Sequence, residues 1–522
     1  MRRTLVIVLG ILFTWMNQAE ARSFFVALNG SNNNPGTISQ PWRTIAFAAS
    51  SASGTAPGDT IHVRAGNYPE TVAPQFSGLP YAFIVIKNYQ NEAVSLNPGR
   101  FSFGNGIDYW KVQGLDVEHS SDSGVAVSGN HAVGFLTLDH CVFSHHKEDG
   151  IILINNFGGV YVYDCIIEWN GEINGLPSGV EGSGIVMYGS AGKLWAKRNW
   201  IAHNWAKGIS HGSETNWQTD GSFLDSNLIV DNYESGMDWW GDNSAIRYNY
   251  FSLNGTRDTE NEEWGDKALA IDNYGTGNLI AFNVIKSSGR WELDPRGSGN
   301  KFYNNTLLKD HYYTAVPGSP YAAAIIFWAA NGPGNEFKNN IIMNLLSQPE
   351  HHFAIIAETY ERYADQIWSH NLYWCPNSSA APPYNRPFKL YNAPGGIYKT
   401  LSQIQSLWPD QEIGSLWASP AFVSIPDSNL TLQPSSPAVD GGIYVGFPFS
   451  GQAPDMGRFE FSEGGTPPWI QPVLLDFITG DGQKLSVNLS PPLIPVLSEI
   501  GSENLALLAA EVQAAMEIAK LR

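Results

Sequence analysis

The sequence predicts an all-β solenoid, a parallel β-helix, for most of the chain. Three observations carry this prediction. Only 15% of the 522 residues are charged, whereas Gly (52) and Pro (31) are frequent and aromatic residues make up 12%. Between residues 60 and 460 no amphipathic helical period is sustained, and short apolar stretches alternate with Pro, Gly and Asn. A short unit also recurs there, and internal repetition is the sequence signature of a solenoid.

The recurring unit is an Asn or Cys followed by two mostly apolar residues and a short polar stretch. It begins at Cys141, Cys165, Asn199, Asn227, Asn249, Asn283, Asn305, Asn340 and Asn371. The shortest spacing, 22 residues, is close to one coil of a parallel β-helix, and the longer spacings indicate coils that carry loops. One coil cannot bury its apolar face alone, so stacked coils must share a core. An Asn at one turn can hydrogen-bond its equivalent on the next coil, and we expect both cysteines to be buried, reduced members of this ladder.

The N-terminal residues 1–21 are typical of a secretory signal. Arg2 and Arg3 precede an apolar run over Leu5–Trp15, and Ala19-Glu20-Ala21 fits the small-x-small cleavage rule. The apolar run is shorter than the ~20 residues that a membrane span needs. We therefore expect an exported chain, secreted or periplasmic, with no transmembrane span in its mature part. Its three cysteines do not suffice for a disulfide framework, so a large core is expected to stabilise it.

The β-helix domain is expected over residues 22–462. In its first part, Pro41–Ala52 carries small and apolar residues at helical spacing and predicts a helix that caps the open end of the solenoid. Pro57-Gly58-Asp59 predicts a turn, and Thr60–Arg64 the first strand.

A C-terminal extension is expected over residues 463–522. Gly464–Pro468 has the composition of a linker. Ser502 is a candidate N-cap of a helix whose apolar stripe consists of Leu505, Leu508, Val512 and Met516. Such a stripe suits packing on the solenoid or contact with a partner, and the sequence leaves the oligomeric state open.

Two segments resemble secreted right-handed parallel β-helix proteins of the pectate-lyase-like superfamily. Phe24–Tyr68 resembles the opening of these proteins, and Ser436–Gly442 with Asp455–Glu460 resembles their closing segment. The resemblance implies right-handed coils from about residue 23 to 460. This superfamily contains lyases, glycoside hydrolases, epimerases and adhesins, so the reaction has to be inferred from the site.

Three aspartates are predicted to stand in one column of stacked coils. They are Asp238, Asp272 and Asp294, each eleven residues before a ladder member (Asn249, Asn283 and Asn305). Equivalent residues on neighbouring coils lie about 4.8 Å apart, and carboxylates that close raise the pKa of at least one of them. Cleavage of a glycosidic bond uses such a pair as acid and as base or nucleophile. On the preceding coil His211 is a further catalytic candidate. A solvated surface ladder and a divalent-metal site are the alternative interpretations.

Aromatic residues concentrate on the same coils. Eight of the 18 Trp lie between residues 195 and 291, and flat aromatic faces suit the C–H faces of sugars. The candidate substrate-binding residues are Trp239, Trp240, Tyr274, Trp217 and Trp264. Because Trp239 and Trp240 are consecutive, a strand would point them to opposite faces, and at least one is expected in the groove. Loops expected at Glu172–Ser183, Gly212–Gly221 and Thr256–Asp266 could wall a cleft there.

A polysaccharide lyase is the alternative chemistry. In lyases a Lys or Arg removes the proton next to a uronate carboxylate that calcium often neutralises, and Lys207, Lys267 and Arg296 are the candidate bases. Glu234–Asp238 has the spacing of an acidic calcium cluster in one pectate lyase family. That resemblance implies a metal site of Glu234, Asp238 and Asp272, although Lys207 stands where the preceding coil would carry an acid. The hydrolase interpretation requires no cofactor.

The net charge of −19 argues against nucleic acid as a partner and fits neutral glycans better than polyuronates. Ser235–Asn283 also resembles β-helix xylosidase-type hydrolases, in which Asp238 and Asp272 match the positions of the catalytic pair. The expected function is therefore an exported glycoside hydrolase acting on a polysaccharide or oligosaccharide through Asp238, Asp272 and Asp294. A calcium-dependent lyase and a non-catalytic sugar-binding β-helix are the alternatives.

Overall fold

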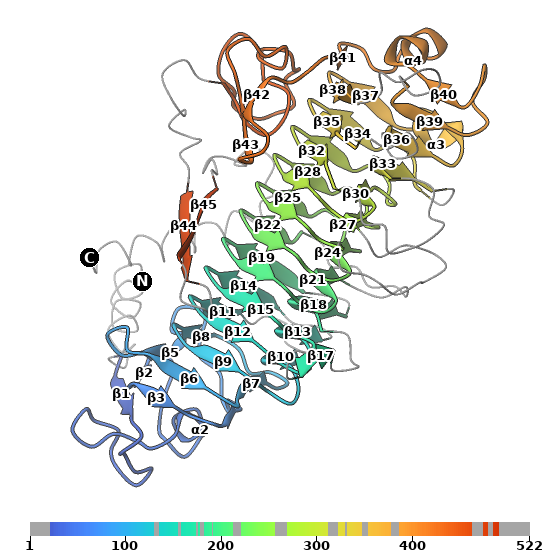
Figure 1. Cartoon of the computed structure of the whole chain (residues 1–522). Helices are drawn as coiled ribbons and strands as arrows, with labels where there is room; N and C mark the ends of the chain where they lie inside the picture. The colour runs from blue at the N-terminus through green and yellow to red at the C-terminus, as the bar shows by residue number, and fades with distance from the viewer. Residues whose placement is uncertain are drawn as a thin grey trace, which may run out of the picture.

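Three long parallel sheets wind around one core in the computed structural model of the chain (Figure 1). The structure describes residues 21–129, 135–154, 158–173, 176–177, 182–189, 192–211, 221–255, 269–311, 322–328, 331–346, 353–376, 386–461, 473–478 and 484–489. Within them each sheet has 13 strands, and consecutive strands of one sheet come from successive coils. This strand order is that of a β-helix, and the all-β solenoid predicted from the repeat is confirmed.

The strands of the sheets are as follows. Sheet 1 contains β1 Ser23–Val26, β2 Thr60–Val63, β5 Ile84–Asn88, β8 Trp110–Gln113, β11 Phe135–Asp139, β14 Gly159–Tyr163, β19 Lys193–Lys197, β22 Phe223–Asp225, β25 Ala245–Arg247, β28 Leu279–Ala281, β31 Lys301–Tyr303, β34 Glu336–Lys338 and β37 Ile367–Ser369. Sheet 2 contains β4 Thr71–Val72, β7 Arg100–Phe103, β10 Val125–Ser128, β13 Ile151–Ile154, β18 Ile185–Tyr188, β21 Lys207–His211, β24 Ser235–Trp239, β27 Leu269–Asn273, β30 Trp291–Asp294, β33 Ala323–Phe327, β36 Phe353–Ala357, β39 Phe388–Leu390 and the antiparallel β40 Tyr398–Lys399. Sheet 3 contains β3 Gly66–Asn67, β6 Val94–Leu96, β9 Asp116–Glu118, β12 Val142–Ser144, β15 Ile166–Glu168, β20 Trp200–Ala202, β23 Leu228–Val230, β26 Tyr250–Ser252, β29 Val284–Lys286, β32 Thr306–Lys309, β35 Ile341–Asn344, β38 Leu372–Trp374 and β41 Leu416–Trp417.

The core consists of columns of inward-facing side chains. In sheet 2, for example, one column runs through Ile209, Met237, Ile271, Leu293 and Ile325, and all five are at most 1% exposed. Burying each such side chain contributes about 1.5–3 kcal/mol. Because the strand register is fixed by these columns, the residues next to them on the outer face are also held in line.

The Asn ladder is present, and it is one of three polar columns. In the predicted ladder the side-chain amide of each Asn donates to the amide oxygen of the Asn on the next coil, from Asn199 through to Asn371. A second ladder joins Asn170, Asn204, Asn232 and Asn254, and a third joins Ser222, Ser244, Asn278, Asn300, Asn335 and Gln366. Cys141 and Cys165 begin the first column as buried free thiols, as expected.

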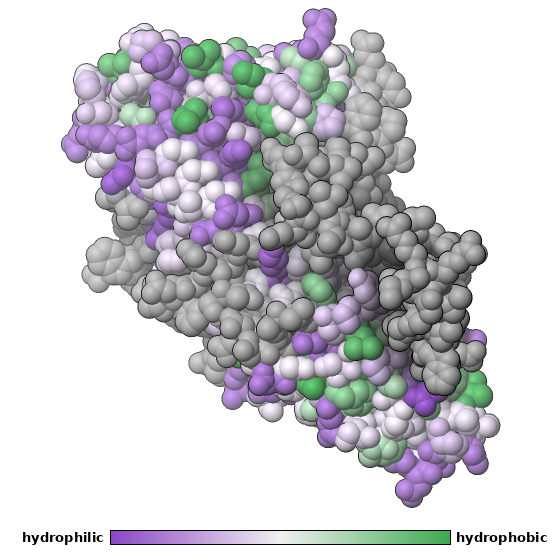
Figure 2. Space-filling view, turned by 180° about the vertical axis from the view of Figure 1, so that it is seen from behind, coloured by the Kyte–Doolittle hydropathy of each residue, from purple (hydrophilic) through white to green (hydrophobic). Residues whose placement is uncertain are grey.

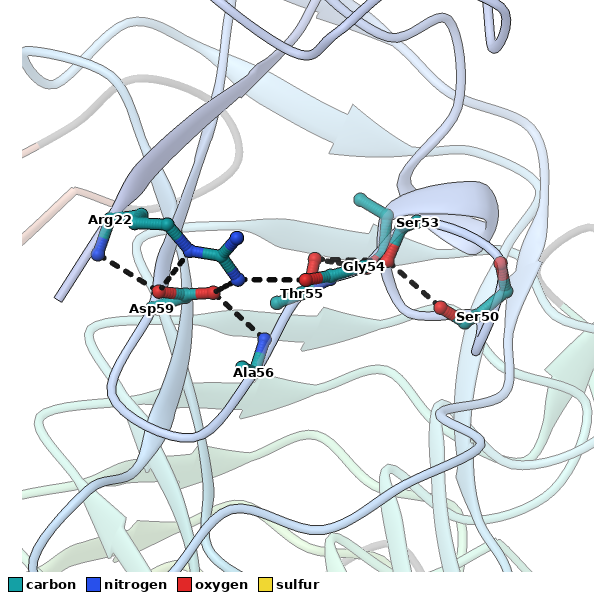
Figure 3. A network of polar contacts seen from close by, with 8 residues as sticks. Arg22, Ser50, Ser53, Gly54, Thr55, Ala56 and Asp59 are labelled. Atoms are coloured by element: carbon teal, nitrogen blue, oxygen red, sulfur yellow. Dashed lines mark hydrogen bonds and ion pairs between the residues drawn. The ribbon is translucent and has the colours of Figure 1, made fainter. Parts of the chain in front are cut away.

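The N-terminal cap is shorter than predicted. The helix α2 spans only Ile45–Ala48, with Thr44 as its N-cap, instead of Pro41–Ala52. The helix ends before two serines, Ser50 and Ser53, whose hydroxyls donate to nearby carbonyls and compete with helical hydrogen bonding. Figure 3 shows the contact of Ser53 with Ser50.

The first strand of the solenoid is β1, which was not predicted from the sequence. It pairs with β2, which lies where the first strand was predicted. Arg22, just before β1, ties it to the turn before β2 by a 2.6 Å ion pair with Asp59 (Figure 3). Burial opposes ionisation of Asp59, but the hydrogen bonds from Arg22 and Ala56 keep its pKa below the usual value.

The chain turns back after the last coil. The short helices α3 Tyr360–Ala364 and α4 Leu401–Leu407 lie among the C-terminal coils, and the hairpin β42 Phe422–Ser424 with β43 Asn429–Leu432 follows β41. Residues of the segment 418–461 then pack against the outside of sheet 3, where Leu430, Ala438 and Met456 join Leu308 and Ile341 in one apolar cluster. The domain predicted over residues 22–462 therefore contains this returning segment as well as the coils.

Two small hairpins lie outside the coils. One pairs β16 Glu172–Ile173 with β17 Leu176–Pro177, and the other pairs β44 Val473–Ile478 with β45 Lys484–Leu489. The predicted signal segment and the predicted helix after Ser502 lie outside the described residues, apart from Ala21. No helix in the described part of the chain is long and apolar enough to cross a membrane.

Candidate functional site

Three aspartates form a column on the outer face of sheet 2. The register pairs Asp238 of β24 with Asp272 of β27, and Asp272 with Asp294 of β30. Their neighbours in the strands, Met237 and Ile271, belong to the core, so the alternation of a strand turns the aspartates outward. The alignment is the one that the ladder spacing predicts, while the catalytic roles stay predictions.

Burial increases steadily along the column. The side chains of Asp238, Asp272 and Asp294 are 20%, 7% and 0% exposed. A solvated surface ladder would show similar exposure at each rung, so this interpretation does not fit. Of the three side chains, that of Asp238 is therefore the most accessible from solvent.

Asp294 is the most buried aspartate of the column. Its carboxylate accepts a hydrogen bond of 2.8 Å from the guanidinium of Arg296 and one of 3.1 Å from the amide of Asn331. A fully buried carboxylate needs such partners to remain ionised. Asn331 was not anticipated, because its place beside the column depends on the path of the chain after β33.

The acidity of Asp272 is strongly perturbed. Burial raises the pKa of its carboxyl well above the usual value, and the negative charges of Asp294 and Asp238 raise it further. Arg296, whose Nε lies 3.3 Å from Asp272, and a hydrogen bond from Tyr274 lower it only in part. A raised pKa is what a general acid requires.

Asp238 keeps a more ordinary acidity because it has its own cation. Burial raises its pKa, whereas Lys207, at 3.3 Å, and a hydrogen bond from Trp240 lower it. The Lys207 ammonium also lies 3.9 Å from the carboxylate of Glu234. In enzymes that use an acid and a base, two neighbouring carboxyls often have surroundings that separate their pKa values.

A second outer column runs beside the aspartates. It consists of the residues two positions after each aspartate, Trp240, Tyr274 and Arg296. The rings of Trp240 and Tyr274 stack at 3.7 Å and 6°, and the Arg296 guanidinium lies over Tyr274 at 4.7 Å. Trp240 is partly exposed, so its ring is available as a flat platform next to Asp238.

Two candidates from the sequence prove to belong to the core. Trp239 is 0% exposed and packs among the core residues, so it contacts no substrate; of the consecutive pair, only Trp240 faces outward. His211 pairs with Trp239 rather than with the aspartates, and the outer position on its coil is Ser210. Its ring lies 5.0 Å from that of Trp239, and burial lowers its pKa to about 4, so it is a neutral interior histidine. The register error arose from the coil between β21 and β22, where the ladder spacing lengthens.

The other candidates cannot be placed in the site. Lys267, Trp217 and Trp264 lie outside the described residues, as do the central parts of the loops expected near residues 212–221 and 256–266. Arg296 is in the site, where it acts as the counter-charge of two carboxylates.

The proposed calcium ligands do not fit a cation well. The Lys207 ammonium lies between Glu234 and Asp238 and would repel an ion bound there. Among the described residues, three donor side chains converge within 4.8 Å only at Asp139, His140 and Asp164 on sheet 1. Lys111 and Arg198 already pair with these two aspartates.

A comparison with protein families identifies the N-terminal coils. Residues 24–165 match the family described as "Pel9A-like, right handed beta helix region". The fold is a pectate-lyase-like right-handed β-helix. The resemblance predicted from the opening segment is thereby confirmed.

The relatives found cover little of the chain or are distant from it. The uncharacterized protein YwoF of Bacillus subtilis (strain 168) is 40% identical over 73 residues, which cover 14% of this chain and only 15% of that protein. The structure of pectate lyase Pel9A aligns with a TM-score of 0.49 and 15% identity, over 84% of this chain and 96% of that one. The structure of XylC with xylose aligns with a TM-score of 0.45 and 13% identity, over 67% and 83%.

The acidity of Asp272 should be visible in stability. A folded-state pKa above the unfolded value makes the folded state lose stability as pH rises from the unfolded value, about 3.9, through the folded one. Asp272→Asn cannot ionise, so we expect this variant to gain stability over the wild type as pH increases through that window. Thermal melts from pH 4 to 9 measure this, and a constant difference across the range would show that Asp272 has an ordinary pKa.

Proposed function

We propose that this chain is an exported carbohydrate-active enzyme, and specifically a glycoside hydrolase. Asp272 is the general acid and Asp238 the base or nucleophile. Burial and Asp294 favour the protonated form of Asp272, and Lys207 favours the ionised form of Asp238. The predicted secretory signal supports export, and the partly exposed Trp240 beside Asp238 supports a sugar as the substrate.

The observation that carries the proposal is a pair of aspartates on adjacent coils, with Lys207 3.3 Å from Asp238 and Arg296 3.3 Å from Asp272. Adjacent rungs lie about 4.8 Å apart, near the separation of about 5–5.5 Å of retaining glycosidases. Burial and two neighbouring carboxylates favour the protonated form of Asp272, whereas Lys207 favours the ionised form of Asp238. The net charge of −19 favours neutral glycans over polyuronates as substrates.

The test is a panel of neutral and acidic polysaccharides with two readouts, each recorded with and without a chelator. One readout is new reducing ends, and the other is the ultraviolet absorbance of the unsaturated uronate that only a lyase makes. The proposal predicts reducing ends without absorbance, unaffected by the chelator. Absorbance that the chelator abolishes would establish a calcium-dependent lyase instead.

A lyase is the second candidate, favoured by Lys207. Its side chain is 23% exposed, and its ammonium lies 3.3 Å from Asp238. Lys207→Met separates the two mechanisms. In a hydrolase the lost cation raises the pKa of Asp238, so the acid limb of the pH–activity profile moves to higher pH while activity survives. If Lys207 is the proton-abstracting base, the variant loses activity at every pH, by about 10²–10⁴-fold.

A further inference from the structure

A second aromatic stack lies on the same side of the solenoid as the aspartates, at the turn before the strands of sheet 2. The rings of Trp205 and Tyr233 stack at 4.4 Å and 19°, and both are partly exposed. Trp205 comes two residues before Lys207, and Tyr233 comes two residues before Ser235, the partner of Lys207 in the register. The stack therefore lies on the coils of β21 and β24, across the strand from Trp240.

The position is defined by the backbone. On six successive coils a backbone N–H of this turn donates to a carbonyl of the previous coil, and the six donors are Lys147, Gly171, Trp205, Tyr233, Gly255 and Gly289. For the last four donors the acceptor is a residue of the second Asn ladder. Aromatic residues occur only in the middle of this column, beside Lys207 and the Asp238 strand. Gly171 and Gly255 flank them with positive φ angles of 88° and 68°, so the aromatic pair is confined to the coils of β21 and β24.

Lys207 connects this stack to the aspartates. Its ammonium lies within 4.0 Å of both Glu234, the residue after Tyr233, and Asp238. Tyr233 comes five positions before Asp238, a span of at most about 17 Å along the chain. A chain of a few sugar units is long enough to contact both residues.

We propose that the Trp205–Tyr233 stack is a second sugar-binding subsite, so that the substrate is a chain that crosses sheet 2 from Trp240 past the aspartates to Tyr233. This inference rests on the proposed function for its substrate class, and it adds that oligosaccharides and polysaccharides are preferred over short glycosides. Aromatic faces stack on sugar C–H faces without regard to charge, which suits neutral chains. Trp205 and Tyr233 touch no reacting atom in this arrangement and serve to position the chain.

The test measures binding separately from catalysis. In an Asp272→Asn background, calorimetry gives the Kd of xylohexaose, cellohexaose and mannohexaose and of the corresponding disaccharides. For the hexasaccharide that binds best, Tyr233→Ala should raise the Kd about tenfold, equivalent to about 1.4 kcal/mol, and the Kd of the disaccharide less than twofold. Tyr233→Phe keeps the ring and should bind like its parent. Trp195→Ala on sheet 1 is the matched control, because Trp195 stacks on Tyr161 at 4.6 Å and 18° away from the site.

With the active enzyme, Tyr233→Ala should raise KM for long chains about tenfold and leave kcat within twofold. Equal losses for hexasaccharide and disaccharide, no loss for either, or no binding of any of the six sugars would overturn the subsite. Chain-length-dependent binding without any hydrolysis would keep the subsite and refute the hydrolase proposal. The two proposals therefore fail independently.

Discussion

Asp272→Asn should lower kcat by about 10²–10⁴-fold, the contribution typical of a positioned general acid. The amide has the shape of the carboxyl but no proton to give to the leaving oxygen. Reducing ends released from the best polysaccharide of the panel measure this, with initial rates taken across the pH range. The wild-type profile should fall on its alkaline side as Asp272 loses its proton, and the residual activity of the variant should lack that limb.

The control is an aspartate with similar surroundings on another sheet. Asp225 is 15% exposed and pairs with Arg247 at 3.2 Å on sheet 1. Asp225→Asn should leave kcat and the pH profile unchanged. If both variants lose activity equally, the effect is one of folding, and if neither does, Asp272 is not the acid.

Much of the fold could be predicted from the sequence because it repeats. The spacing of Asn249, Asn283 and Asn305 was enough to align Asp238, Asp272 and Asp294, since a buried ladder allows no slip between coils. The count of eleven residues does not hold on the preceding coil, and the candidate chosen there, His211, lies one position beyond Ser210, the residue that pairs with Asp238. One residue of register moves a side chain from the outer face to the core.

The electrostatics of the site could not be obtained from the spacing. Nothing in the sequence indicates that Asp294 is fully buried while Asp238 is one-fifth exposed, because this depends on what covers each rung. The contact from Asn331 joins residues 37 positions apart. The choice between Trp239 and Trp240 likewise depends on the phase of the strand, which an alternating pattern leaves open for two consecutive tryptophans.

Arg296→Met should destabilise the protein by about 3–5 kcal/mol, the loss typical of removing one partner of a buried ion pair. Asp294 is fully buried, so the variant removes a cation that lies 2.8 Å from a carboxylate without access to water. Equilibrium unfolding in urea measures the change. The partly exposed pair of Arg198 and Asp164 on sheet 1 is the comparison, and Arg198→Met should cost less, about 1 kcal/mol.

The double variant Arg296→Met, Asp294→Asn distinguishes two causes of the lost stability. It removes the buried charge together with its partner, so most of the stability should return if an uncompensated Asp294 is the cause. A double variant as unstable as Arg296→Met alone would instead assign the loss to the contact of Arg296 with Tyr274. Because Arg296 also lowers the pKa of Asp272, Arg296→Met should move the alkaline limb of activity to higher pH. A protein in which stability falls but this limb stays in place would separate the structural role of Arg296 from its influence on the acid.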